Sequence, residues 1–235
     1  PIIQGKLSIK DGATIRGIVF DGASEVVDAI RIDDTVTGAP VVISGCTVRN
    51  YTNRFVYVSL SGKIESLTID DCIFIGADNS TTNKAIYASS AHTQVETLSV
   101  TNSTFLNFNT GSNYFFRINC GEELVLMPVV LIDHCTFYNC YDRRGVYLYN
   151  AGRSTIKNCI SAFSERRDDT KSFTAYGDES IVKNVISYNV DLYGSAPKEN
   201  IISKNPLFVD AENGNFQLYK DSPAVGAGDD GSDLG

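Results

Sequence analysis

Residues 130–139 read VLIDHCTFYN, and the same pattern returns six more times along the chain. In each copy, apolar residues two positions apart precede a small polar residue, and a small apolar or sulfur-containing residue follows it. Aligning the copies on that last position gives a spacing of 24 to 32 residues, which is typical of a solenoid. The aligned residues are Ile18, Cys46, Cys72, Ser103, Cys135, Cys159 and Val185.

A second recurring segment lies between successive copies, at residues 29–33, 55–59, 85–89, 115–119, 145–149 and 172–176. Its apolar residues alternate with others, and a period of two indicates a half-buried strand. At least two short strands per repeat, without a helical pattern, predict an all-β, single-stranded parallel β-helix of about seven rungs. We expect one domain over residues 1–235, with rungs at about 13–203 and a C-terminal β cap at about 204–235.

Two columns of small or polar residues mark the expected corners of the coil. Glycine, asparagine and aspartate tolerate the left-handed backbone of a tight corner, and their side chains can bond neighbouring rungs. The first set, the corner column, is Gly17, Gly45, Asp71, Asn102, His134, Asn158 and Asn184. The second set predicts a partial asparagine ladder and is Gly22, Asn50, Gly76, Asn107, Asn139, Phe163 and Asn189. Because His134 falls in the corner column, we interpret the Asp133–His134 pair as structural rather than catalytic.

Composition excludes several classes of protein. Of 235 residues, 43% are hydrophobic, which is enough for a substantial core, and the net charge of −8 argues against a nucleic-acid partner. The sequence contains no run of eighteen apolar residues, so we predict no membrane-spanning segment, and we expect a monomer. The chain opens on PIIQGK without a signal-peptide pattern, so any signal has been removed or lies outside this sequence, which could be the C-terminal part of a longer protein.

Six cysteines fit no zinc-binding spacing. Four of them share the inward column and are expected to be unpaired core thiols, whereas Cys120 and Cys140 lie off it and could form a disulfide. The DAENGN stretch at 210–215 departs from the EF-hand pattern and instead predicts a hairpin turn on Asn-Gly.

The second strand also predicts a surface. If its apolar residues point inward, the next residues face solvent, and we call them the outward column: Arg31, Tyr57, Tyr87, Arg117, Tyr147 and Thr174. Two positions further lie Asp33, Ser59, Ser89, Asn119, Tyr149 and Tyr176. Corners add Arg143 and Arg144, with Arg166 and Arg167 nearby. Tyrosine rings offer flat faces to sugar rings, and arginine offers a planar fork to carboxylate or sulfate. Two interpretations stay open: a groove for an anionic polysaccharide, or ordinary cross-strand packing.

The stacked I-x-N-C-x-F rungs resemble the right-handed, pectate-lyase-like β-helix superfamily. The closing segment NPLFVDAENGNFQLYKDSPAVGAG (205–228) is similar to the end of secreted β-helix proteins of gut Bacteroidetes, many described only as polysaccharide lyases or as uncharacterised. The resemblance implies a right-handed coil, an extracellular, periplasmic or cell-surface location, and a uronic-acid-containing glycan as partner. It agrees with a substrate-binding set of Arg31, Tyr57, Tyr87, Arg117, Tyr147 and Tyr149.

The resemblance leaves the activity open. A lyase of this kind needs a base, for which the candidates are Arg117, Arg143 and Arg144, and Ca²⁺ or arginine to neutralise the uronate. The catalytic residues of the lyase families do not map onto this sequence, and beyond Asp33 and Asp34 no carboxylate cluster is predicted for Ca²⁺. We therefore predict no metal ligands and no cofactor other than Ca²⁺ in the case of a lyase. His92 and His134 are the only histidines. The alternatives are a structural or adhesive solenoid and, less favoured, a uronate isomerase or epimerase.

Overall fold

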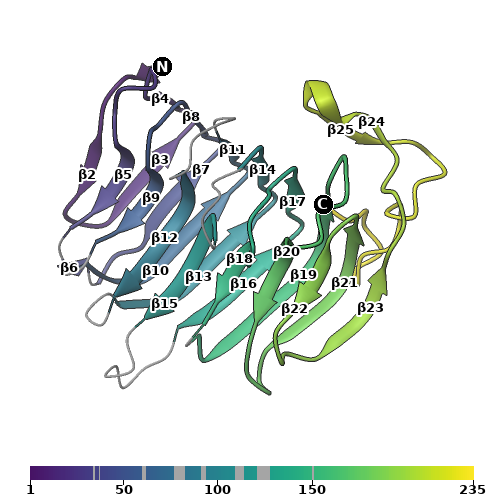
Figure 1. Ribbon diagram of the computed structural model, residues 1–235. Helices are drawn as coiled ribbons and strands as arrows, with labels where there is room; N and C mark the ends of the chain where they lie inside the picture. The colour runs from purple at the N-terminus through teal and green to yellow at the C-terminus, as the bar shows by residue number, and fades with distance from the viewer. Residues whose placement is uncertain are drawn as a thin grey trace.

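The computed structural model describes residues 1–33, 35–36, 38–59, 62–76, 83–90, 94–108, 114–120, 128–149 and 151–235. The strands form a parallel β-solenoid of about 6 turns, close to the predicted seven rungs, and the described part contains essentially no helix. Figure 1 shows the strands stacked along one axis from the N-terminal to the C-terminal end. The predicted all-β solenoid is confirmed.

Each full turn contributes three strands, one more than the two recognised in the sequence. A left-handed corner divides each copy of the 130–139 pattern, so its two halves pair with neighbouring rungs as separate strands. The first series is β3 (Ala13–Arg16), β7 (Val41–Ser44), β10 (Lys63–Asp70), β13 (Gln94–Thr101), β16 (Val129–Asp133), β19 (Arg153–Ala162), β21 (Ile181–Tyr188) and β23 (Lys198–Ile202). The second is β1 (Ile2–Ile3), β4 (Val19–Asp21), β8 (Thr47–Arg49), β11 (Ile73–Ile75), β14 (Thr104–Leu106) and β17 (Thr136–Tyr138). The next member of this series is the C-terminal part of β19, which pairs with β17.

A third series carries the predicted outward column. It forms an 8-stranded sheet and consists of β2 (Leu7–Ile9), β5 (Asp28–Ile32), β9 (Arg54–Val58), β12 (Lys84–Ser90), β15 (Phe116–Cys120), β18 (Val146–Leu148), β20 (Lys171–Ala175) and β22 (Asp191–Tyr193). A short strand, β6 (Thr35–Val36), pairs with β10. Each turn therefore presents one strand of this sheet, and its outward side chains line up along the solenoid.

The corners agree with the sequence prediction in backbone conformation. All seven residues of the corner column have a positive φ, between 49 and 62°. In the second column only Asn50, Asn107, Asn139 and Asn189 do so. The asparagine ladder, however, runs along the corner column, where Asn184 bonds Asn158 at 3.4 Å and Asn200 bonds Asn184 at 2.8 Å. In the described part of the second column, Asn50 donates to Asp21 and Asn189 donates to the Phe163 carbonyl, whereas Asn139 accepts from Tyr141 and Ser164. These side chains therefore bond neighbouring rungs without forming asparagine–asparagine pairs.

The interior is filled by stacked columns of apolar side chains. Phe105 stacks on Phe74 at 5.0 Å and on Phe137 at 4.8 Å, with ring planes within 7° of parallel. The four column cysteines are buried and free, as predicted, and Cys140 is also a buried free thiol. Burial raises the pKa of the Cys140 thiol. The proposed disulfide partner Cys120 has a side chain outside the described part.

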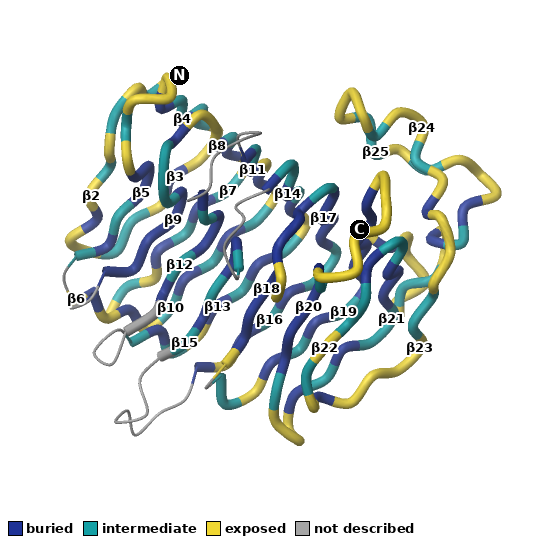
Figure 2. Tube along the Cα trace, viewed as in Figure 1, coloured by how far each residue is buried: buried dark blue, intermediate teal, exposed yellow. Residues whose placement is uncertain are grey.

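The C-terminal segment folds back onto the solenoid. Strands β24 (Phe208–Asp210) and β25 (Asn215–Leu218) form an antiparallel hairpin around η1 (Ala211–Asn213), so the hairpin predicted at 210–215 is confirmed. Its turn is a 3-10 turn that ends at left-handed Gly214, rather than a two-residue Asn-Gly turn. Most of the hairpin is exposed (Figure 2). Phe208 and Phe216 pack against Tyr138 of β17.

The last residues lie against the corner column, where they contact the Asp133–His134 pair. His134 Nε2 lies 2.7 Å from Ser232 Oγ, and His134 Nδ1 lies 2.8 Å from Asp133 Oδ1. Asp229 binds Lys157 at 3.2 Å and Lys183 at 3.1 Å. These contacts fix the chain end on the solenoid and give the Asp-His pair a structural role.

Candidate functional site

The outward face of the third sheet brings the predicted site residues into one line. Pairing of β5, β9, β12, β15, β18 and β20 places the outward column in exact succession from one strand to the next: Arg31, Tyr57, Tyr87, Arg117, Tyr147 and Thr174. The register predicted from the repeat is therefore confirmed. Whether these residues bind a ligand is a separate question that depends on their accessibility and charge.

Accessibility differs from the prediction along this line. Tyr57 and Tyr147 are each only 6% exposed, and Thr174 is fully buried, whereas Arg31, Tyr87 and Arg117 are partly exposed. The prediction that the whole column faces solvent was thus wrong for three of its six members. The reason for the two tyrosines is local, because neighbouring side chains on the same face lie over their rings.

Those covering side chains form a second column, which the repeat pattern of the sequence does not reveal. We call it the leading column, because each member lies three residues before its outward residue: Asp28, Arg54, Lys84, Tyr114 and Arg144. An alternation of inward and outward residues does not predict this column, because two consecutive residues, Phe55 and Val56, are both buried between Arg54 and Tyr57. A count of three residues back from each outward residue would have found it.

At the N-terminal end of the face, the cations have carboxylate partners. The Arg54 guanidinium lies 3.7 Å from the Tyr57 ring centroid and its Nε donates to Asp28 at 2.8 Å. Arg31 binds both Asp28 and Asp33. Asp28 is 3% exposed, so this end of the face is an internally neutralised cluster.

The centre of the face is a stack of tyrosines and arginines. The Tyr114 and Tyr147 rings stack at 5.9 Å and 14°, and Tyr149 stacks on Tyr147 at 5.7 Å and 10°. The Arg117 guanidinium lies 4.5 Å from the Tyr114 ring centroid and donates to its hydroxyl. Arg144 lies 4.7 Å from the Tyr147 centroid. The two guanidinium groups therefore share one aromatic platform.

Charge is unbalanced at this centre. Among the residues that the structure describes, Arg117, Arg143 and Arg144 form no ion pair, and the buried Arg117 Nε has no hydrogen-bond acceptor. By contrast, Arg166 pairs with Asp191 and Arg167 pairs with Glu165, so these two do not extend the basic spot. Of the predicted cations, three are thus available for an anionic group.

Lys84 completes the cluster from the leading column. Burial lowers the pKa of its ammonium group, and Arg117 acts in the same direction while Asp142 opposes it. The Lys84 ammonium lies 5.5 Å from the Tyr114 ring centroid. Positive side chains here are held close together, an arrangement stabilised when an anion binds.

The exposed aromatic surface continues toward the C-terminal end. Tyr149 is 39% and Tyr193 56% exposed, and Tyr176 lies between β18 and β22 with its ring 5.6 Å from that of Tyr149. Seven of the chain's 12 tyrosines lie on this face: Tyr57, Tyr87, Tyr114, Tyr147, Tyr149, Tyr176 and Tyr193. The most accessible part of the site is therefore displaced from Tyr57 toward Tyr149.

Possible cation ligands are sparse in the described residues, where no group of three or more His, Cys, Asp and Glu side chains could hold a metal ion. His92 and Asp34 lie outside the described residues. No helix of the described part is both long and apolar enough to cross a membrane.

Comparison with known families adds one match. Residues 2–110 match a domain of unknown function (DUF4957). The match spans less than half of the 235 residues. It includes Arg31, Tyr57 and Tyr87, whereas the central arginines and Tyr147 lie beyond it. No curated protein matches the chain.

Proposed function

We propose that the protein binds an anionic, uronic-acid-containing polysaccharide across the outward face of β12, β15 and β18. The observation that carries the proposal is the pair Arg117 and Arg144, which share an aromatic platform without a carboxylate partner in the described residues. Guanidinium groups bind carboxylates through two parallel hydrogen bonds, and the tyrosine rings beside them suit the apolar faces of sugar rings. A surface or secreted location, outside the cytoplasm, follows from such a partner.

Stacked rungs suit a linear polymer because they repeat the same kind of contact at about 4.8 Å intervals. Tyr87, Arg117, Arg144 and Tyr149 are the binding residues in this proposal, and the buried Tyr147 ring supports the Arg144 guanidinium. Arg31 and Tyr57 are peripheral, since the Asp28 cluster neutralises that end of the face.

A structural solenoid is the second candidate, and the burial of Tyr57 and Tyr147 favours it. Each cation-π contact contributes about 0.5–1 kcal/mol at an exposed site, so the same residues could stabilise the sheet without any ligand. The two candidates differ in what removal of Arg144 does: a binding role predicts lost affinity, and a purely structural role predicts only lost stability.

The first test uses affinity electrophoresis in gels that contain pectate, alginate, chondroitin sulfate or heparin. We expect at least one of these polymers to retard the native protein, and Arg144→Ala to weaken that binding about tenfold, or about 1.4 kcal/mol. Arg167→Ala is the matched control, because Arg167 also lies over a tyrosine ring, 3.8 Å from the Tyr141 centroid, but has a carboxylate partner. Equal retardation of all three proteins would contradict the proposed site.

The same incubations can be followed at the ultraviolet absorbance of unsaturated uronates. An increase would add polysaccharide-lyase activity to binding, with Arg117, Arg143 and Arg144 as the candidate bases and added Ca²⁺ as the variable to test. Retardation without absorbance change supports a binding protein, and absence of both supports the structural solenoid.

A further inference from the structure

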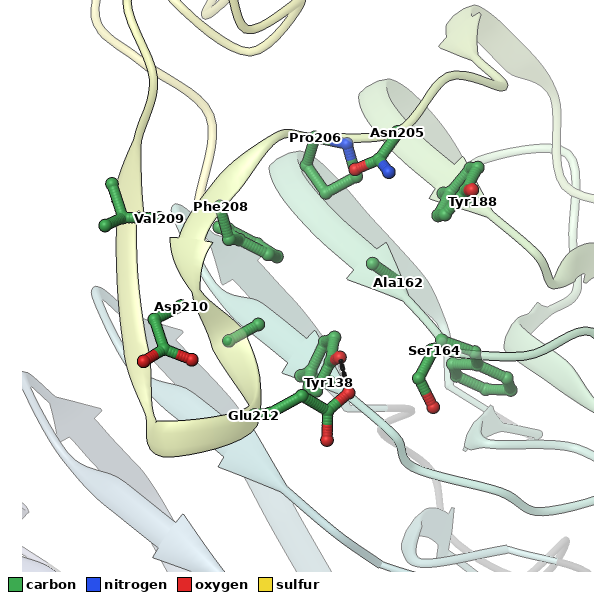
Figure 3. A pocket seen from close by; sticks show the side chains of 12 residues that line it. Tyr138, Ala162, Ser164, Tyr188, Asn205, Pro206, Phe208, Val209, Asp210 and Glu212 are labelled. Atoms are coloured by element: carbon green, nitrogen blue, oxygen red, sulfur yellow. Dashed lines mark hydrogen bonds between the residues drawn. The ribbon is translucent and has the colours of Figure 1, made fainter.

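A cleft of about 350 Å³ lies on a different face, between the C-terminal hairpin and the second series of strands. We call it the hairpin cleft. In Figure 3, Tyr188 and Phe208 lie on opposite sides with Ala162 between them, and Glu212 lies beside Tyr138. Its volume falls within the range of sites for small molecules.

The cleft is fixed in shape by contacts between the hairpin and β17. Tyr138 donates a hydrogen bond of 2.6 Å to Glu212 Oε1, and its ring packs edge-on against Phe216 at 5.5 Å and Phe208 at 6.2 Å. Phe208 and Phe216 pack against each other at 5.1 Å. The hairpin is therefore held by an aromatic cluster, and a ligand would meet a preformed site.

The chemistry of the lining is aromatic and acidic. Four rings contribute, from Tyr138, Phe163, Tyr188 and Phe208, and two carboxylates, Asp210 and Glu212, with no lysine, arginine or histidine. Asp210 accepts hydrogen bonds from Asn213, whereas Glu212 has no cation partner among the described residues. The charge is thus opposite to that of the arginine-rich face, so a uronate would be repelled here.

We propose that the hairpin cleft binds an organic cation, in the form of an ammonium group on a small apolar body. Ring faces attract a cation within about 6 Å of their centroids, and the effect increases as the site excludes water. Glu212 supplies the countercharge at the rim, and the half-buried rings of Tyr188 and Phe208 supply the apolar contact. This site is separate in position and in charge from the proposed polysaccharide face.

Calorimetric titration with choline tests the proposal, with 3,3-dimethylbutan-1-ol as the uncharged analogue of the same shape. We expect choline to bind at least tenfold more tightly than the alcohol. Equal affinity for the two would show an apolar pocket only and would overturn the proposal, as would absence of choline binding or binding of a neutral monosaccharide such as galactose instead.

Variants of the full chain then locate the site. Glu212→Gln keeps the acceptor for Tyr138 but removes the charge, and we expect a fivefold or greater loss of choline affinity. Glu199→Gln, on exposed β23, is the control and should bind as the native protein does. If Glu212→Gln failed to fold, the comparison of choline with its uncharged analogue on the native protein would still decide. Polysaccharide retardation should be unchanged by Glu212→Gln, so each proposal can fail without the other.

Discussion

At the scale of single residues, the corner column explains how the successive turns of the solenoid keep the same path. A non-glycine residue with positive φ is strained, and asparagine offsets the strain with side-chain bonds. Asn158 shows this most completely. It is fully buried, donates to Asp133 at 2.9 Å and Asp229 at 2.8 Å, and accepts from the Asp229 backbone at 3.1 Å.

Substitution at Asn158 separates backbone strain from hydrogen bonding. Asn158→Gly removes the side-chain bonds but tolerates the φ of 52°, and we expect a loss of about 1–3 kcal/mol. Asn158→Ala should lower the free energy of unfolding by about 1–2 kcal/mol more, because the Cβ of alanine strains the left-handed backbone. Urea denaturation gives both values. Equal stability of the two variants would mean that strain at this corner is negligible.

The backbone conformation of this corner could be predicted from the sequence, because a left-handed φ depends on local sterics and favours glycine, asparagine and aspartate. What could not be predicted is the partner of the corner. Asp229 lies 71 positions beyond Asn158, in a segment without repeat character, and no local pattern specifies where such a segment docks.

At the scale of elements, the third-series strands show where a period of two stops being informative. The register of the outward column was predicted correctly because every rung repeats the same alternation. The leading column was missed because the chain turns inward twice in succession at Phe55 and Val56, and again at Phe115 and Phe116. The exposure of Tyr57 and Tyr147 depends on that column, so it was overestimated for the same reason.

The docked C-terminal segment is an element whose stability should depend on pH. Hydrogen bonds from Asn158 and Lys183 lower the pKa of Asp229 below its ordinary value of 3.8. A carboxyl with a lowered folded pKa contributes stability above its unfolded pKa and loses that contribution as pH falls through the folded value. We therefore expect Asp229→Asn to lower Tm at neutral pH, and the difference from the native protein to close as pH falls below about 4.

Thermal unfolding of both proteins from pH 7 down to pH 2 measures this difference. Asp221→Asn, at an exposed aspartate without an ion pair in the described residues, is the control and should follow the native curve. A Tm difference that widened toward low pH would show that Asp229 is not stabilised by its contacts with Lys157, Lys183 and Asn158.

At the scale of the whole molecule, a single repeat accounts for both the core and the surfaces. Stacking equivalent positions creates continuous columns, so the solenoid can present basic and aromatic groups on one face while its cap encloses an acidic cleft on another. The repeat could be predicted because it is periodic in the sequence. The cleft could not, because it forms between a rung and a hairpin that lie 70 residues apart, as Tyr138 and Phe208 do.

The same stacking makes a prediction about cooperativity. Each rung contacts mainly its neighbours, so the two halves unfold together only if the interface between them is strong. Phe105 lies at that interface, between Phe74 and Phe137. The buried thiols report on each side, with Cys46 and Cys72 before it and Cys135, Cys140 and Cys159 after it.

We expect both groups of thiols to become alkylated at one urea midpoint in the native protein. Phe105→Ala should cost about 3–5 kcal/mol and separate the two midpoints, as peptide mass spectrometry after pulsed iodoacetamide would show. Two midpoints already present in the native protein would mean that the phenylalanine stack does not couple the halves, whereas Val209→Ala, at an exposed position in the hairpin, should leave a single midpoint unchanged.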